Sequence, residues 1–201
     1  MRIRTTFQGF LEDLYNELLE NLDGSVADYI PELAKADATD FGIAIVTVDG
    51  HVYQVGDSHK NFSIQSISKA FAYGVALHDK GIDSVFSKVD VEPSGEAFNS
   101  ISLEPETGRP RNPMINAGAI AITSLVNGDT AEAKINRILE RFEIYAGHSL
   151  EVDEAIYQSE KTTGHRNRAI SHLLRNYDIL ESDPEQSLDA YFQQCSIKVT
   201  C

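Results

Sequence analysis

Residues 62–71 read Phe-Ser-Ile-Gln-Ser-Ile-Ser-Lys-Ala-Phe, and they place Ser66 and Lys69 three positions apart. We expect them in the first turn of a helix that runs to about Lys80. An α-helix has about 3.6 residues per turn, so both side chains would lie on one face. A lysine whose charged form is disfavoured by burial and by the helix dipole can deprotonate a serine. The outward backbone N–H of Ser66 would hold an oxyanion.

The same spacing also has a purely structural interpretation. Roughly one Ser-x-x-Lys is expected by chance in about 200 residues. The helix that follows is apolar on nearly all sides, however, and such a helix is buried; its apolar residues include Ala70, Phe71, Tyr73, Val75, Ala76 and Leu77. Lys69 is therefore expected to be shielded from water, which favours the catalytic interpretation.

Composition limits the class of protein. The chain has 201 residues, of which 42% are hydrophobic and 24% charged, as in an ordinary globular domain. Its net charge of -14 has no basic stripe to offset it, so we expect no nucleic-acid partner. No run of 18 apolar residues and no signal-peptide pattern occurs, so we expect no membrane association.

Cysteine and histidine usage adds two expectations. The two cysteines, Cys195 and Cys201, both lie near the C-terminus, which suits a reducing compartment and a cytoplasmic location. The six histidines form no ligand cluster, and Gly-x-Gly-x-x-Gly and P-loop patterns are absent from the sequence. We therefore expect neither a metal nor a cofactor.

Before Ser66, hydrophobic periodicity predicts four elements. They are a helix over 7–22 ended by Gly24, a shorter helical piece over 27–34, and two strands over 42–48 and 51–55. Asp49-Gly50 between the strands is a strong hairpin signal, so the two strands are expected to pair antiparallel.

After the Ser66 helix, residues 82–118 show weak periodicity and many turn residues, so we expect a long ordered loop. Asn116, near its end, has an amide that could bind a substrate carboxylate or amide. A turn-capping role is the alternative. The last third is predicted to be helical, with helices over 131–145, 151–158, 163–176 and 187–199. Within it, Glu160 and Asn167 flank a polar joint from which both could reach one pocket.

Several blocks closely resemble the glutaminase family, in order, from about residue 24 to the last residue. They include Tyr29-Ile-Pro-Glu-Leu-Ala34, Gln65-Ser-Ile-Ser-Lys69, Glu92-Pro-Ser-Gly95, Asn112-Pro-Met-Ile-Asn-Ala-Gly-Ala-Ile120 and Tyr191-Phe-Gln-Gln-Cys-Ser196. The resemblance implies an α+β fold of the serine β-lactamase and penicillin-binding-protein type, mostly helical, with an N-terminal antiparallel hairpin. We expect a single domain over 1–201, with the elements of a sheet lobe in 1–65 and a helical lobe in 66–201.

The resemblance also implies an activity, the hydrolysis of L-glutamine to L-glutamate and ammonia. Carried over by position, it makes Ser66 the nucleophile, Lys69 its base and Tyr191 a partner in proton transfer. The glutamine-binding residues would be Ser66, Asn116, Glu160, Asn167 and Tyr191, with Tyr29 lining the pocket. The expected partners are this small-molecule substrate and further copies of the chain in a homo-oligomer.

The family pattern continues past residue 201 into further strands of the sheet, one of which carries a second oxyanion donor. We therefore expect those strands to be missing from this chain, and its own activity to be an open question. Two alternatives follow. The chain is an inactive fragment or assembly module, or it is a related serine acylase acting on β-lactams or peptides.

Overall fold

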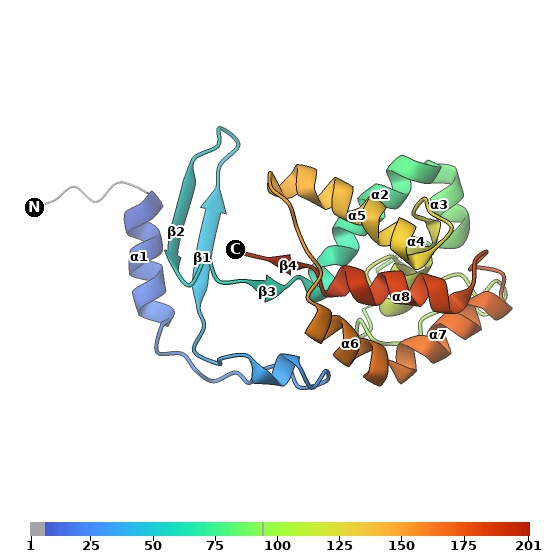
Figure 1. Ribbon diagram of the computed structural model, residues 1–201, viewed down its shortest axis with the longest axis horizontal. Helices are drawn as coiled ribbons and strands as arrows, with labels where there is room; N and C mark the ends of the chain where they lie inside the picture. The colour runs from blue at the N-terminus through green and yellow to red at the C-terminus, as the bar shows by residue number, and fades with distance from the viewer. Residues whose placement is uncertain (1–6, 94) are drawn as a thin grey trace, which may run out of the picture. The chain divides into compact units, whose positions relative to one another are not determined.

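The computed structural model describes residues 7–93 and 95–201 and divides into two units (Figure 1). The first, here the sheet unit, contains residues 7–62 and 199–201; the second, the helical unit, contains residues 63–198. The chain passes between them in β3 (Phe62–Ser63) and β4 (Lys198–Val199), which pair with each other. No helix in the described ranges is long and apolar enough to cross a membrane.

The sheet unit is built on the predicted hairpin. β1 (Gly42–Val46) pairs antiparallel with β2 (Val52–Gly56), so that Gly42 lies opposite Gly56 and Val46 opposite Val52. Gly50 in the connecting turn has φ +87°, a conformation that glycine adopts without steric cost. The hairpin predicted from Asp49-Gly50 is confirmed.

One helix covers this hairpin, and it is shorter than predicted. α1 (Phe7–Leu18) packs against β2 and buries Leu11, and Tyr15 stacks on Phe41. The helix ends at Leu18 rather than Leu22, because Leu19 and Leu22 are exposed and no burial holds a further turn.

The helix predicted over 27–34 is wrong. Only a 3₁₀ turn, η1 (Leu33–Lys35), forms there. Pro31 lacks a backbone N–H and disfavours helical geometry at the residue before it, so the short apolar pattern does not become an α-helix.

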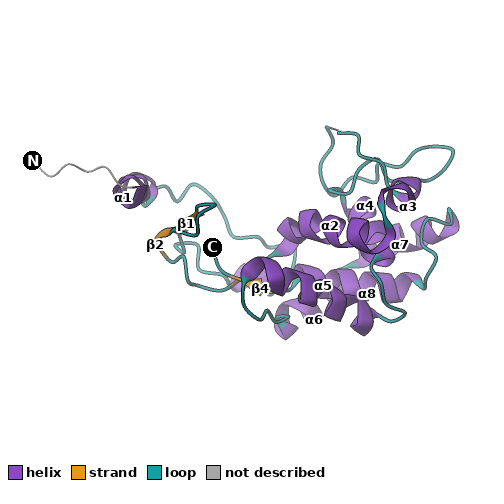
Figure 2. Cartoon of the chain, turned by 90° about the horizontal axis from the view of Figure 1, so that it is seen from above, coloured by secondary structure: helices purple, strands orange, loops and turns teal. Residues whose placement is uncertain are grey.

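The helical unit contains most of the secondary structure (Figure 2). Its elements are η2 (Gln65–Ile67), α2 (Ser68–Lys80), α3 (Ile82–Lys88), α4 (Asn116–Leu125), α5 (Ala131–Ala146), α6 (Glu154–Thr163), α7 (His165–Asn176) and α8 (Pro184–Cys195). α4 is central, since it packs against α2, α7 and α8 and buries almost every residue. Its apolar sequence therefore forms the core on which the other helices rest.

Comparison with the predicted helices shows where periodicity was sufficient. The helix over 131–145 is confirmed as α5, which Thr130 caps by accepting from Ala133 N.

The loop predicted over 82–118 begins with a helix instead. Gly81, at φ +78°, ends α2, and α3 buries Val85 over its seven residues. Seven residues are too few for periodicity to separate a helix from a loop.

The other helix boundaries moved. The helix predicted over 151–158 begins at Glu154, because Asp153 caps it, and runs on to Thr163. The helix predicted over 187–199 begins at Pro184 and ends at Cys195. Its last four predicted residues form a turn and β4 instead.

Gly118 in α4 is expected to be intolerant of any side chain. A Cβ there would lie 1.9 Å from the main-chain oxygen of Asn112. We expect Gly118→Ala to lower the free energy of unfolding by about 1–3 kcal/mol through overpacking, measured by urea denaturation. Gly74→Ala is the matched control, because a Cβ at Gly74 in α2 would meet nothing within 4 Å. That variant is expected to gain about 0.5–1 kcal/mol. Equal stability of the two variants would contradict the prediction.

Candidate active site

Ser66 and Lys69 lie at the junction of two helical segments. Ser66 is in η2, and α2 follows without a break, so Lys69 is the second residue of α2. The residue before the serine, Gln65, has φ +45°, in the left-handed region that non-glycine residues seldom adopt. Such strained backbone persists only where its surroundings fix it.

Buried side chains hold this strained turn. Ser68 Oγ donates to the carbonyl of Gln65 at 2.6 Å, and Gln194 Nε2 donates to Ser68 Oγ at 3.0 Å. The Thr123 hydroxyl lies 3.0 Å from Gln194 Oε1. Ser68, Thr123 and Gln194 are all 0% exposed, so α4 and α8 brace the start of α2 from within the core. This network places Ser66 on the surface while Lys69 points inward.

The Lys69 amine is deeply enclosed. The residue is 2% exposed, and Nζ donates to Asn116 Oδ1 at 2.7 Å and to the Met114 carbonyl at 3.1 Å. The Phe98 ring centroid lies 5.3 Å from Nζ. Burial lowers the pKa of Lys69, against the opposing influence of Cys195 and Glu160. A larger share of neutral amine, which a general base requires, is therefore present at neutral pH than for an ordinary lysine.

Asn116 links Lys69 to a third element. Asn116 is the first residue of α4, and its Nδ2 donates to Oδ1 of Asn167, in the first turn of α7, at 3.1 Å. The amide orientation is consistent, because Asn116 Oδ1 accepts from Lys69 while its nitrogen donates. Residues far apart in the sequence thus converge on one polar cluster.

Glu160, on α6, is the acidic member of this cluster. It is 7% exposed, and its Oε2 is buried without a hydrogen-bond partner among the residues that the structure describes. Burial raises the pKa of Glu160 to about 8, although the charge of Lys69 acts in the opposite direction. A buried polar oxygen without a partner is costly, which makes Glu160 a candidate binding residue.

A pH-dependent effect follows for Glu160→Gln. The folded-state pKa of Glu160 is raised, so the folded chain holds a proton that the unfolded chain releases above about pH 4.5. Stability is then lost as pH rises from there through about 8. We expect Glu160→Gln to match the unmodified chain in acid and to exceed it above pH 8 by about 1–3 kcal/mol. Urea denaturation across this range measures the difference. A difference that does not vary with pH would contradict it.

The two predicted tyrosines, Tyr191 and Tyr29, lie in different surroundings. Tyr191, on α8, is buried and hydrogen-bonds to the thiol of Cys195, which interacts electrostatically with both Lys69 and Glu160. Tyr29 is in the sheet unit and is exposed, so its place in a pocket stays a prediction. Among residues 7–93 and 95–201, no hydrogen bond joins Ser66 to Lys69. The role of Ser66 also stays a prediction.

Sequence reasoning missed several contributors to this cluster. Met114 acts through its main-chain carbonyl, for which no side-chain signal exists. Gln194 and Cys195 follow Tyr191 by three and four residues on one helix, and this spacing is the signal that places them on the same face as Tyr191. Phe98 lies within the segment 82–118 predicted as a loop, where no periodicity marks it as a neighbour of the lysine amine.

The fold and this cluster define a class. The chain is a mostly helical α+β protein of the serine β-lactamase type, with a small antiparallel sheet and an enclosed lysine one turn after a serine. The family model for glutaminase matches residues 24–201, and the chain belongs to that family.

Known relatives support this assignment and are longer. The glutaminase of Trichormus variabilis is 54% identical over 191 residues, covering 95% of this chain and 57% of the relative. The glutaminase of Clostridium tetani is 51% identical, covering 89% and 60%. This chain thus spans less than two thirds of the length of either relative.

Solved structures agree. The crystal structure of Mglu in its native form has a TM-score of 0.92 and 41% identity, over 98% of this chain and 48% of that one. The probable glutaminase ybaS has a TM-score of 0.91 and 40% identity, over 96% and 63%.

Proposed function

We propose that this chain carries the serine–lysine site of an enzyme that hydrolyses L-glutamine to L-glutamate and ammonia through a serine acyl-enzyme. One observation carries the proposal. The Lys69 amine is buried, held by Asn116 and Met114, and joined through Asn116 to Asn167, with an unpaired Glu160 oxygen nearby in the same cluster. Names of relatives that read glutaminase support the choice of substrate.

The proposed reaction uses two proton transfers by one amine. Neutral Lys69 takes the proton of Ser66, and Ser66 Oγ attacks the side-chain amide carbon of glutamine. The backbone N–H of Ser66 stabilises the oxyanion. The Lys69 ammonium then returns its proton to the leaving nitrogen, ammonia departs, and water hydrolyses the ester to release glutamate. Tyr191 would share this proton traffic through the same buried cluster.

Substrate binding follows from the charges in the cluster. The α-ammonium of glutamine would pair with Glu160, whose unpartnered oxygen and raised pKa suit a carboxyl that ionises when a cation arrives. Asn116 and Asn167 would orient the remaining polar groups, and Tyr29 would line the pocket. A good general base contributes roughly 10²–10⁴ in rate, so Lys69 is the residue on which turnover depends most after the nucleophile.

The cellular setting is part of the same proposal. Cys195 and Cys201 are both free thiols, which suits a reducing cytoplasm. Phe71, Ile144 and Tyr145 are exposed on α2 and α5, which favours a homo-oligomer. Light scattering of the purified chain tests the assembly, and a monomer at every concentration would refute it. Fractionation of the source cells tests the location.

The deciding experiment measures ammonia and glutamate released from L-glutamine by the 201-residue chain. Equal amounts of both products are expected. No release at high protein concentration would favour an inactive fragment or an assembly module. Covalent labelling of Ser66 by penicillin, without glutamine turnover, would favour a related serine acylase. Mass spectrometry of the intact chain distinguishes the two.

A further inference from the structure

We propose that Asn112 is a positioning residue for Lys69, because its side chain folds the turn that aims the Met114 carbonyl and the start of α4 at the lysine amine. The link to turnover rests on the proposed function, whereas the link to the Lys69 amine does not. Asn112 is the first residue of the Asn112-Pro-Met-Ile-Asn block, and neither the family resemblance nor the proposed reaction gives it a role.

The first half of the argument concerns the side-chain oxygen of Asn112. It accepts hydrogen bonds from the backbone N–H groups of Met114 at 3.0 Å and Ile115 at 3.2 Å. This is an Asx-type turn, in which a side chain takes the place of a main-chain acceptor. Because Ile115 N donates to Asn112, the turn fixes the peptide group formed by the Met114 carbonyl and the Ile115 N–H. That carbonyl accepts from Lys69 Nζ. Asn116, the other acceptor, follows two residues later.

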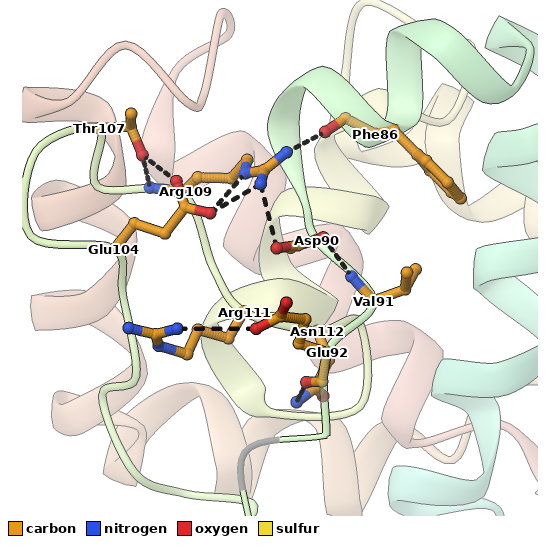
Figure 3. A network of polar contacts seen from close by, with 9 residues as sticks. All are labelled: Phe86, Asp90, Val91, Glu92, Glu104, Thr107, Arg109, Arg111 and Asn112. Atoms are coloured by element: carbon orange, nitrogen blue, oxygen red, sulfur yellow. Dashed lines mark hydrogen bonds and ion pairs between the residues drawn. The ribbon is translucent and has the colours of Figure 1, made fainter.

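The second half concerns the side-chain nitrogen, which ties the turn to a braced loop (Figure 3). Asn112 Nδ2 donates to the Glu92 carbonyl at 3.1 Å. Next to this contact, Glu92 N donates to the Arg111 carbonyl and Asp90 N to that of Pro110. The two segments are thus held as a short ladder on which the turn is mounted.

Arg109 clamps that ladder. Its guanidinium donates to the Phe86 carbonyl at 2.8 Å, to Asp90 at 3.0 Å and to Glu104 at 2.7 Å (Figure 3). The hydrogen bonds that Arg109 donates to Glu104, together with the charges of Asp90, Glu104 and Glu92, raise the pKa of Arg109 further, so the clamp stays charged. The segment that Asn112 Nδ2 contacts is therefore held by several hydrogen bonds, and the Asn112 side chain links it to the Met114 turn.

The main chain of Asn112 meets α4 as well. Its carbonyl oxygen lies 1.9 Å from the position that a Cβ on Gly118 would take, so the turn packs directly onto the first turn of α4. Pro113 supplies no N–H and restricts the residue before it, which leaves the Asn112 side chain as the main source of hydrogen bonds in the turn. Each polar atom of this side chain has a defined partner: the oxygen holds the turn that contains the Met114 carbonyl, and the nitrogen ties that turn to the Glu92 segment.

The consequence is an effect on the amine itself. Both acceptors of Lys69 stabilise its charged form, since an ammonium donates and does not accept. If the Met114 carbonyl turns away, the charged form loses one partner and the pKa of Lys69 falls. Glu160 and Cys195, the ionisable groups that interact with the amine, lie on α6 and α8, outside the turn, and stay in place.

The test is a titration of the Lys69 side chain by NMR in chains carrying ¹³C at lysine Cε, with the resonance assigned by its loss in Lys69→Arg. We expect Asn112→Ala to lower the midpoint. Asn112→Asp keeps an oxygen that can accept from Met114 N and Ile115 N, and it loses only the Nδ2 donor to the Glu92 carbonyl. It also adds a negative charge near the ammonium, so its midpoint is expected at or above that of the unmodified chain. Where glutamine turnover is measurable, Asn112→Ala is expected to lower kcat about tenfold or more with KM little changed, as for a misplaced catalytic group.

Arg111→Ala is the matched control. The Arg111 side chain is in the same loop but pairs with the Glu92 carboxylate at 3.9 Å and acts on the charge of Glu104, and its ladder contacts use main-chain atoms. It is expected to leave the Lys69 midpoint unchanged. An unchanged midpoint in Asn112→Ala, or one lowered in Asn112→Asp, overturns the inference. If Asn112→Ala does not fold, the Asn112→Asp result alone decides. A chain that shows the shift but does not hydrolyse glutamine would refute the proposed function and leave this inference standing.

Discussion

Ser66→Ala is expected to abolish glutamine hydrolysis, with a fall in kcat on the order of 10⁴–10⁶, the loss seen when a serine nucleophile is removed. The alanine has no oxygen to form the acyl-enzyme, and water would have to attack the amide directly. Because Ser66 is exposed, the substitution is expected to change the free energy of unfolding by less than about 0.5 kcal/mol. Ammonia release and urea denaturation measure the two quantities.

A matched control for Ser66→Ala is the same substitution at a serine outside the cluster around Lys69. Ser87→Ala on α3 is suitable, since the Ser87 hydroxyl donates to the Ser84 carbonyl of its own helix. It is expected to keep full activity. Retention of a tenth or more of the activity in Ser66→Ala would show that another group attacks the substrate.

Lys69→Met has the second largest expected effect. Methionine fills a similar buried volume but cannot take a proton, so kcat is expected to fall by roughly 10²–10⁴. The substitution also removes the positive charge that lowers the pKa of Glu160, so that carboxyl is expected to titrate at a higher pH than in the unmodified chain. Turnover assays and a ¹³C NMR titration of Glu160 check the two outcomes independently.

Lys35→Met is the corresponding control, because Lys35 is an exposed lysine in the sheet unit that forms an ion pair with Glu32. Turnover and the Glu160 titration are both expected to be unchanged. A Lys69→Met chain with normal kcat would rule out the amine as the base, whatever the burial of the residue.

The elements that sequence predicted well are those with strong local signals. Asp49-Gly50 indicated the hairpin, and the apolar face of residues 131–145 indicated α5. The errors arose where tertiary context or chain length decided. α3 is too short for its periodicity to indicate a helix. Pro31 prevents the α-helix that hydrophobic periodicity predicted over 27–34.

The candidate site was predictable only in part. Burial of Lys69 followed from the apolar helix around it, and this prediction is confirmed. Spacing alone does not indicate that Asn116, Asn167 and Glu160 converge on that amine, since they come from three separate helices. The polar joint at 159–167 suggested that Glu160 and Asn167 share a pocket, and the resemblance added Asn116 to them. Contacts made by main-chain atoms, such as the Met114 carbonyl, leave no trace in residue types.

The helical unit begins and ends at one place. Ile64 N donates to the carbonyl of Ile197 at 2.9 Å, so the two ends of this unit are hydrogen-bonded neighbours. A segment with adjoining ends is suited to circular permutation, with new termini at an exposed site such as Gly147–Ser149. The same adjacency also suits grafting. Residues 63–198, which contain Ser66, Lys69 and the residues around them, could be joined at both ends to two neighbouring strands of another protein's sheet.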